Sequence, residues 1–345
     1  MRTQTILTLA AFSTFVAWAL TWVIRDYALR SKLLDRPNDR SSHTVPTPRG
    51  GGVAIVSAFF VAMVALGYFA LADPHLLAAL GGACAIVALL GFLDDRNGLS
   101  ARLRLVGHTA AAVWTLVWIG PLPSIQVLGL TVDLGIGAAV LCALYIVWSI
   151  NLFNFMDGID GIASLEAIGV GLGGSLVWWL VQPAGDWPVA VLFAACVGGF
   201  LVWNFPTARI FMGDAGSGSL GLVVAVLALW SSRATPHLFW CWLILSGCFI
   251  VDATATLIRR VLRGERFYQA HRHHAFQYAA RKHASHKVVT LAVVAINTFW
   301  LLPLAVAVAL QWLGGLAGVL LAYGPLLWVA LHYKAGDRAG QGELA

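Results

Sequence analysis

Long apolar segments follow one another along almost the whole chain, and the polar residues gather in the short stretches between them. Each segment is close to the roughly 20 residues that cross a hydrocarbon core as a helix. We count eleven, at 5–24, 50–72, 76–93, 105–120, 134–152, 162–182, 187–204, 215–232, 236–258, 288–311 and 315–333. Their apolar residues are continuous rather than alternating, which favours helices over a barrel. The pattern predicts an all-α integral membrane protein with about 11 transmembrane helices.

The composition fits this prediction and excludes an ordinary soluble protein. Of the 345 residues, 59% are hydrophobic and 11% are charged, whereas soluble domains carry about a quarter charged residues. The first segment is of full spanning length and lacks a small-residue cleavage pattern, so we do not expect a cleaved signal peptide. The five cysteines lie within apolar segments without metal-type spacing and indicate small buried hydrophobes. We predict one membrane domain over 1–334, and a disordered tail over 335–345.

The basic residues divide sharply between the two predicted faces of the membrane. Of 22 lysines and arginines, 20 fall in one set of alternate loops, while Arg2 and Arg233 fall in the other. By the positive-inside rule the first set is cytoplasmic, which puts the N-terminus in the periplasm and the C-terminus in the cytoplasm. The net charge of +6 therefore lies on one face, where it can attract anionic lipid or a phosphate-bearing substrate. Membrane topology explains the basic loops without nucleic acid.

Two adjacent acids, Asp94 and Asp95, end the third apolar segment in "GFLDDRNGLSARLR". Acidic residues at membrane depth are costly and mark function by default. Neighbouring positions on a helix point about 100° apart, so the two carboxylates should face different partners. The alternative is a simple helix end, where two acids and Arg96 reach the aqueous phase.

The stretch "NLFNFMDGIDG" (151–161) places polar residues at every third position of an otherwise apolar chain. They are Asn151, Asn154, Asp157 and Asp160. On a helix these positions spread over more than half the circumference, as expected for the mouth of a cleft. The glycines that follow allow the backbone to bend. Non-helical backbone at membrane depth is tolerated only where it lines a water-filled cavity. A plain polar turn between two spans is the alternative.

Glycine-rich sequence surrounds Asp214 in "FMGDAGSGS", where a span begins. Glycines allow close backbone approach, and the N–H groups of a helix start favour an anion such as phosphate. An aspartate at such a start can be a plain N-cap. Beside phosphate it is suited to Mg²⁺, which takes one or two protein oxygens and completes its shell with phosphate and water.

A histidine cluster, His271, His273 and His274 with Arg272, follows a basic segment. Imidazoles suit zinc, but the cluster lacks a cysteine or the i, i+4 pair of common zinc sites. A role for these side chains as hydrogen-bond donors to phosphate oxygens fits the cluster better than zinc binding. The alternative is a basic loop that lies on lipid headgroups. His43 and Arg49 in the first inner loop carry the same two interpretations.

Glu166 and Asp252 lie within apolar segments, and we interpret both as structural residues paired inside the bundle. The other polar groups of the inner face are carboxylates, carboxamides, histidines and arginines. This set suits metal-assisted phosphoryl transfer between a soluble and a lipid substrate. A secondary transporter is the main rival, although transporters gather their sites near the bilayer midplane between repeats, and no repeat is visible here. An intramembrane aspartyl protease would need a second aspartate in a facing span, and it would have no use for clustered histidines.

These motifs resemble the polyprenyl-phosphate N-acetylhexosamine-1-phosphate transferases. The likeness covers nearly the whole chain, in family order and spacing. Its segments are "RPNDRSSHTVPTPRGGG", "GFLDDRNGLSARLRL", "NLFNFMDGIDG", "FMGDAGSGSLG" and "HRHHAFQ". The resemblance implies transfer of a sugar 1-phosphate from a UDP-N-acetyl-sugar to undecaprenyl phosphate, with UMP as the second product. It also implies a Mg²⁺ cofactor, or Mn²⁺ in its place.

The resemblance also suggests roles for individual residues. Asp214 matches the family's metal-ligand aspartate, with Asn154 as its companion. Asp94 and Asp95 match an aspartate pair proposed to assist or position the lipid phosphate. Asp157 and Asp160 match polar positions near the nucleotide and diphosphate of the donor. The histidines His271, His273 and His274 match a motif expected to contact phosphates or the donor sugar. The other substrate-binding positions are His43, Arg49, Asn151 and Arg272.

Two departures from the peptidoglycan members of the family favour an O-antigen type enzyme. The first inner loop reads "VPTPRGGG", and the histidine motif continues as "HAFQYAARKH". The donor sugar stays open among N-acetylglucosamine, N-acetylfucosamine and N-acetylquinovosamine. The resemblance further implies a bacterial inner-membrane protein whose active site faces the cytoplasm among membrane lipids. A homodimer is the oligomeric state we consider.

Overall fold

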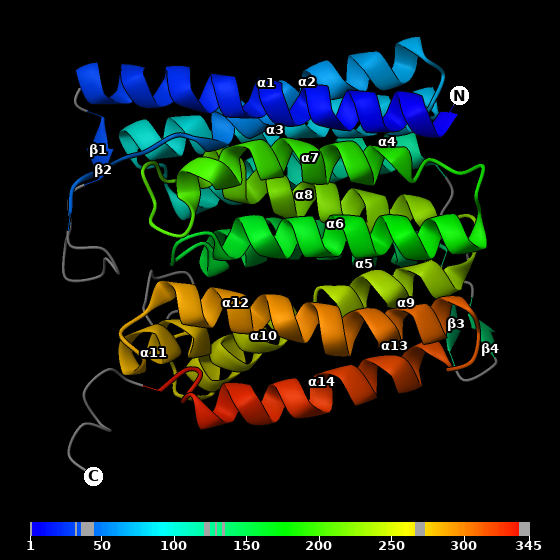
Figure 1. Cartoon of the computed structure of the whole chain (residues 1–345). Helices are drawn as coiled ribbons and strands as arrows, with labels where there is room; N and C mark the ends of the chain where they lie inside the picture. The colour runs from blue at the N-terminus through cyan, green and yellow to red at the C-terminus, as the bar shows by residue number, and fades with distance from the viewer. Residues whose placement is uncertain are drawn as a thin grey trace.

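The computed structural model describes residues 2–31, 33–35, 45–120, 125–127, 130–132, 135–265 and 273–337. Helices that run roughly along one common direction form a bundle (Figure 1). Their bounds are α1 Arg2–Arg30, α2 Gly52–Tyr68, α3 Pro74–Asn97, α4 Ala101–Ile119, α5 Ile136–Met156, α6 Ile162–Val181, α7 Pro188–Asn204, α8 Asp214–Ser231, α9 Pro236–Leu245, α10 Gly247–Leu262, α11 Ala275–Lys282, α12 His286–Ile296, the π-helix η1 Asn297–Leu301, α13 Leu302–Ala309 and α14 Gly315–His332. The protein is therefore an all-α membrane protein, apart from two small hairpins.

The eleven apolar segments correspond to helical elements throughout. Two of them contain breaks: 236–258 is divided into α9 and α10, which meet at an angle of 71°, and 288–311 contains the π-helix. Within the described residues, seven helices are long and apolar enough to cross a membrane, or up to eight if the bent pair is one span. The other elements, α2, α4 and α7, are either 17 residues long or carry arginines at one end. A count of eleven spans thus stays a prediction.

Helix α8 forms the centre of the bundle, because every one of its residues from 215 to 231 is buried. It packs against α3 and α5, and α7 packs against α1 on the outside. The outer helices leave large apolar side chains uncovered, among them Trp328, which is 68% exposed, and Phe299, which is 80% exposed. In a membrane these side chains meet lipid rather than water, so their exposure agrees with the composition.

Glycines bring the helices around the start of α8 into backbone contact. A Cβ on Gly91 of α3 would collide with the backbone of Ala215, and one on Gly52 of α2 would collide with Gly216. Glycine at such positions permits an approach that no other residue allows. The polar ends of α2, α3 and α8 are consequently held close together.

The connections between helices divide between two ends of the bundle (Figure 1). The N-terminus lies at one end, where Arg2 donates to the carbonyl of Gly185 and the Asp186 carboxylate accepts from Trp230 Nε1 at 2.8 Å. The other end carries most of the basic residues that the structure describes and the candidate site residues among them. We call it the site end. The same alternation was the basis of the predicted topology.

Short hairpins and the last described residues complete the fold. At the site end β1 (Leu34–Asp35) pairs with β2 (Thr47–Pro48), and at the opposite end β3 (Ile125–Val127) pairs with β4 (Leu130–Val132). Ala335 is fully buried, and its carbonyl accepts from Arg259. The first residues of the predicted tail are thus packed on the bundle, and 338–345 lie outside the described residues.

Candidate active site

Two aspartates, one at the end of α3 and one at the start of α8, lie side by side at the site end. Asp95 Oδ1 accepts a hydrogen bond from the Asp214 backbone N–H at 3.0 Å, and its Oδ2 accepts from the Ala215 N–H at 3.5 Å. The carboxylate of one helix therefore caps the first turn of another. This arrangement orients Asp95 and fixes the backbone on which Asp214 is mounted.

Asp94 faces a different set of partners, as the 100° rotation between neighbouring helical positions predicts. It accepts a hydrogen bond from the Leu99 N–H in its own turn, and Arg104 Nη1 of α4 lies 3.0 Å from its Oδ2. The side chain of Asp94 is 8% exposed. Asp94 is therefore held by the end of its own helix and by α4, and its side chain also hydrogen-bonds Asp214 of α8, whose backbone N–H is bound by Asp95.

Arg49 connects the first inner loop to both aspartates of the α3–α8 pair. Its Nη2 lies 2.7 Å from Asp95 Oδ1 and 2.8 Å from Asp214 Oδ1. The loop is fixed next to α8 because Arg49 forms a parallel bridge with Phe211, and Phe211 donates its N–H to Pro48. One guanidinium thus joins two carboxylates, with its side chain 37% exposed toward the aqueous side.

The "DGIDG" turn adds a third carboxylate to this cluster. Asp157 follows the last residue of α5, and Gly161, with φ of 71°, precedes α6 and donates its N–H to Asn204. Burial, followed by the neighbouring charge of Asp214, raises the pKa of Asp157 to about 7. One helical turn earlier, Asn154 Nδ2 donates to Ser217 Oγ of α8 at 3.2 Å.

The charges of this carboxylate cluster, defined as Asp94, Asp95, Asp157 and Asp214, do not balance. When all four are ionised they face two arginines, Arg49 and Arg104, which leaves two negative charges. A divalent cation would supply the missing charge. Among the described residues no three His, Cys, Asp or Glu side chains converge as a complete ligand set. This donor set fits Mg²⁺, which needs only one or two protein oxygens.

Asp160 and Asn151 point away from the carboxylate cluster. Asp160 Oδ1 lies 3.2 Å from His286 Nδ1, and its Oδ2 accepts from the Ala208 N–H. It borders a cavity of 590 Å³ whose other walls include Thr207, Gln277, Arg281 and Lys287. We call this the polar cavity.

Asn151 Nδ2 donates to Val147 and lies 3.3 Å from His108 of α4. These partners lie on α4 and α5, so the four polar positions of 151–161 do not converge on one point.

Part of the histidine motif lies beside the "DGIDG" turn. His273 and His274 precede α11, and Phe276 and Gln277 pack so closely on Gly158 that an added Cβ would lie 3.0 Å from both. Burial, followed by the charge of Arg260, lowers the pKa of His273. A neutral imidazole can donate to phosphate or accept from a hydroxyl. His43, His271 and Arg272 lie outside the described residues.

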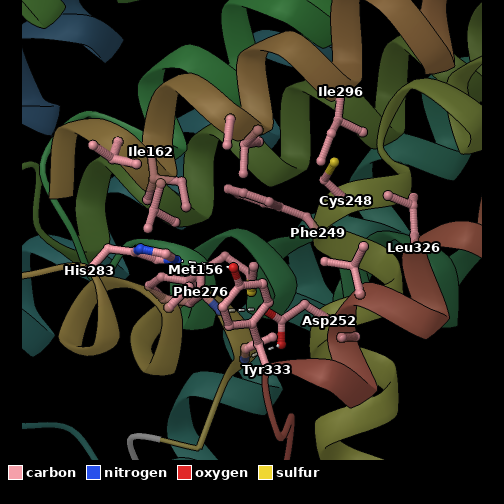
Figure 2. A pocket seen from close by; sticks show the side chains of 18 residues that line it. Met156, Ile162, Cys248, Phe249, Asp252, Phe276, His283, Ile296, Leu326 and Tyr333 are labelled. Carbon is pink, nitrogen blue, oxygen red and sulfur yellow. Dashed lines mark hydrogen bonds between the residues drawn. The ribbon is translucent and has the colours of Figure 1, made fainter. Parts of the chain in front are cut away.

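Asp252 of α10 holds the start of α11 in place. Its Oδ1 accepts from the Ala275 N–H at 2.9 Å and its Oδ2 from the Phe276 N–H at 3.0 Å (Figure 2). His274 Nδ1 lies 3.4 Å from the same carboxylate. The sequence interpretation of Asp252 as a paired structural residue agrees with these contacts but missed that its partner is the histidine motif. The signal was present, because a carboxylate within an apolar segment is a functional candidate by default.

Sequence comparisons identify proteins that this chain resembles. Residues 76–232 match the sequence profile described as "Glycosyl transferase family 4". The chain is 29% identical over 286 residues to a "Probable undecaprenyl-phosphate N-acetylglucosaminyl 1-phosphate transferase" of Bacillus subtilis, covering 81% of this chain and 78% of that protein. It is 30% identical over 327 residues to a "Decaprenyl-phosphate N-acetylglucosaminephosphotransferase" of Mycobacterium leprae, covering 82% and 78%. It is 27% identical over 232 residues to a "Phospho-N-acetylmuramoyl-pentapeptide-transferase" of Streptococcus pyogenes, covering 62% and 66%.

Proposed function

The chain belongs to glycosyl transferase family 4, and from this membership we propose that it is a polyprenyl-phosphate N-acetylhexosamine-1-phosphate transferase. An oxygen of undecaprenyl phosphate attacks the sugar-proximal phosphorus of a UDP-N-acetyl-sugar. The bond from that phosphorus to the bridging oxygen breaks, UMP leaves, and undecaprenyl-diphosphate-sugar forms. One observation carries the proposal: Arg49 pairs with Asp95 and Asp214 beside the turn that holds Asp157.

The cluster supplies what phosphoryl transfer requires, namely fixed charges at the reacting phosphates. Arg49 is placed to hold an anionic oxygen between α3 and α8. Arg104 of α4 holds the Asp94 carboxylate in one orientation. In this proposal Asp94 and Asp95 position the acceptor phosphate, and the backbone hydrogen bonds at Asp95 prevent that carboxylate from rotating.

Asp214 would hold a Mg²⁺ ion, with the Asn154 carboxamide beside it and Asp157 within electrostatic reach. When bound, the ion neutralises the diphosphate and polarises its oxygens. Two observations support this assignment. The cluster keeps two uncompensated negative charges when all four carboxylates are ionised, and Asp214 lies in the first turn of α8.

We assign the donor side of the site to the "DGIDG" turn and the histidine motif. His273, whose pKa is lowered by burial, would meet phosphate or sugar as a neutral imidazole. Asp160, oriented by His286, borders the polar cavity. By resemblance, His271, Arg272 and His43 would also contact the donor, although they lie outside the described residues.

We further propose that the chain crosses the bacterial inner membrane eleven times, with the N-terminus periplasmic and the site end cytoplasmic. Each predicted segment corresponds to a helical element, and the loops of the site end carry nearly all the basic residues. UDP-sugars are water-soluble and undecaprenyl phosphate is a membrane lipid, so a site where the bundle meets the cytoplasm gives access to both. The reaction would begin O-antigen or another cell-envelope polysaccharide, and a homodimer is the assembly we propose.

The test is UMP release by the full chain in detergent, with each substrate omitted in turn. A panel of UDP-GlcNAc, UDP-FucNAc, UDP-QuiNAc and UDP-MurNAc-pentapeptide identifies the donor sugar. We expect release only when undecaprenyl phosphate, a UDP-N-acetyl-hexosamine and Mg²⁺ are all present. Counterflow of labelled substrate across vesicles without any UMP would instead favour a transporter and overturn the proposal.

A further inference from the structure

An apolar cavity of 220 Å³, separate from the polar cavity, lies between α10, α11, α12 and α14 (Figure 2). Its walls are mainly aliphatic and aromatic, with Phe249, Val289, Ile296 and Leu326 among them. An apolar cavity of about 150 Å³ is already large enough to bind benzene. This cavity has room for the end of one hydrocarbon chain.

The α12 and α14 walls of the cavity belong to outer helices of the bundle. Val288, which lines it from α12, is 54% exposed, and Trp328, next to the lining residue Val329 of α14, is 68% exposed. In a membrane-spanning bundle such surface meets acyl chains, because no water is available in the hydrocarbon region. The cavity therefore adjoins lipid-facing surface of the bundle.

A rim of basic and aromatic side chains marks the site-end margin of the cavity. His283 and Tyr333, which line it, are hydrogen-bonded at 3.1 Å. Lys282 Nζ lies 5.5 Å from the centre of the Tyr333 ring, and Lys334 Nζ lies 5.5 Å from that of Tyr278. Neither lysine forms an ion pair with a carboxylate in the part of the chain that the structure describes. Two uncompensated cations at the membrane surface favour an anionic headgroup.

Helix α11 lies between this cavity and the polar cavity. The apolar cavity also reaches Met156 and Ile162, which flank the turn that holds Asp157, but none of the four carboxylates of the cluster lines it. Ala275, Phe276, Ala279 and His283 line the apolar cavity, whereas Gln277 and Arg281 line the polar one. The Phe276 ring closes the gap by packing on Gly158. An acceptor lipid must bring its phosphate to the carboxylate cluster, and no member of that cluster lines this cavity. The occupant of the apolar cavity is therefore a different lipid.

We propose that the cavity and its rim, Lys282, His283, Tyr333 and Lys334, bind one anionic phospholipid of the surrounding membrane. One acyl chain fills the space between α12 and α14, and the phosphate lies against the two lysines. Bound there, the lipid supports the face of α11 opposite the polar cavity. This site is distinct from both substrate positions of the proposed reaction.

Native mass spectrometry of the full chain in detergent tests the site with three probes: phosphatidylglycerol, phosphatidylcholine of the same chains, and undecaprenyl phosphate. We expect one phosphatidylglycerol per chain, bound at least fivefold tighter than phosphatidylcholine. Lys282→Gln and Lys334→Gln should each weaken phosphatidylglycerol about fivefold. Arg30→Gln is the matched control, because Arg30 is an exposed cation of the site end that lies on α1 and pairs with Asp26.

Filling the cavity should remove the lipid altogether. Ala330→Phe places a ring in the cavity from α14. Ala292→Phe does the same from α12, and because Ala292 is exposed this change should leave folding intact. Retention of phosphatidylglycerol by Ala292→Phe, equal binding of the two phospholipids, or one-for-one displacement by undecaprenyl phosphate would each overturn the proposal. Because binding is measured without turnover, a chain that holds phosphatidylglycerol but releases no UMP overturns only the proposed function.

Discussion

The guanidinium of Arg49 lies 2.8 Å from the carboxylate of Asp214, although 165 residues separate the two in the chain. The same Nη2 atom lies 2.7 Å from Asp95. Three polar segments from different parts of the sequence thus meet at one guanidinium. Any anion bound at this place displaces part of an existing charge network, so binding and charge balance are coupled.

Replacing Arg49 should reduce transfer strongly, because it removes the positive charge shared by two carboxylates and the approaching phosphate. We expect Arg49→Ala to lower kcat/KM about 100-fold. Arg49→Lys should recover only part of this loss, since an ammonium cannot contact two carboxylates as a planar fork does. Steady-state UMP release checks both, with Arg30→Ala as the control that should match wild type. Near wild-type turnover of Arg49→Ala would remove this residue from the mechanism.

Metal binding should depend on Asp214 and Asn154 rather than on Asp160. Chelation with EDTA should stop UMP release, and added Mg²⁺ should restore it. Titration with Mn²⁺, followed by electron paramagnetic resonance, measures affinity without turnover. Asp214→Ala and Asn154→Ala should each weaken Mn²⁺ at least about tenfold, whereas Asp160→Asn, whose carboxylate faces His286, should leave it unchanged. Equal affinities across the three variants would place the metal elsewhere.

The pH dependence of metal affinity should identify Asp157. Its pKa is raised to about 7 by burial and by the charge of Asp214, so the carboxyl is neutral below pH 7 and negative above it. A cation bound nearby must displace this proton at low pH. The Mn²⁺ dissociation constant should therefore rise with falling pH below 7, by at most about tenfold per unit. Burial, followed by the charge of Asp95, raises the pKa of Asp214 to about 6, so this carboxyl takes up its proton at lower pH. Asp157→Asn does not titrate and should reduce the slope around pH 7, leaving the part that Asp214 contributes nearer pH 6.

The hydrophobic pattern predicted the helices but not their irregularities. The segment 236–258 was predicted as one span, yet the chain turns by 71° between α9 and α10, at Ser246 and Gly247. A serine–glycine pair is a common place for a helix to bend, so this break had a local signal. The segment 288–311 contains a π-helix that starts at Asn297, and the Asn297 side chain donates to Glu166 of α6. This pairing depends on which helices become neighbours, and local sequence does not encode that.

The site was predictable as a collection of residues but not as a set of pairs. Topology alone brings Asp94, Asp157 and Asp214 to the same end of the bundle, because each lies where a predicted span meets the same face. Helix rotation and packing decide which aspartate of "DD" faces Arg49. They also decide that Asp160 pairs with His286. Asp252 was interpreted correctly as paired, but its partner lies 23 residues further along the chain.

The buried pair Glu166 and Asn297 should contribute to stability rather than to chemistry. Glu166 is fully buried, and Asn297 Nδ2 donates to its Oε2. Asn297→Ala leaves that carboxyl oxygen without its donor and should cost about 2 kcal/mol. Thermal unfolding in detergent measures the loss, which should appear as a lower Tm while the KM for the UDP-sugar stays constant. A changed KM with an unchanged Tm would point to a functional role instead.

Asp252 should act on the reaction through the histidine motif. Asp252→Ala removes both acceptors from the N–H groups of Ala275 and Phe276, so the start of α11 loses its fixed position. A misplacement of about 1 Å can cost about 100-fold in rate. Asp252→Asn keeps one acceptor oxygen and should lose less. Thr254→Val, a similar change on the same helix at a half-buried residue that is hydrogen-bonded to neither Asp252 nor the motif among the described residues, is the control and should stay within about twofold of wild type.

A double-mutant cycle separates positioning by Asp252 from a general loss of stability. If Asp252 acts through His274, then Asp252→Ala combined with His274→Ala should be no slower than His274→Ala alone, because the second change removes what the first displaces. Hydrogen exchange of the peptide covering 275–282 should increase in Asp252→Ala, while that of α8, which is buried throughout, stays unchanged. Multiplied rate losses in the double variant, or unaltered exchange at 275–282, would show that Asp252 does not position the motif.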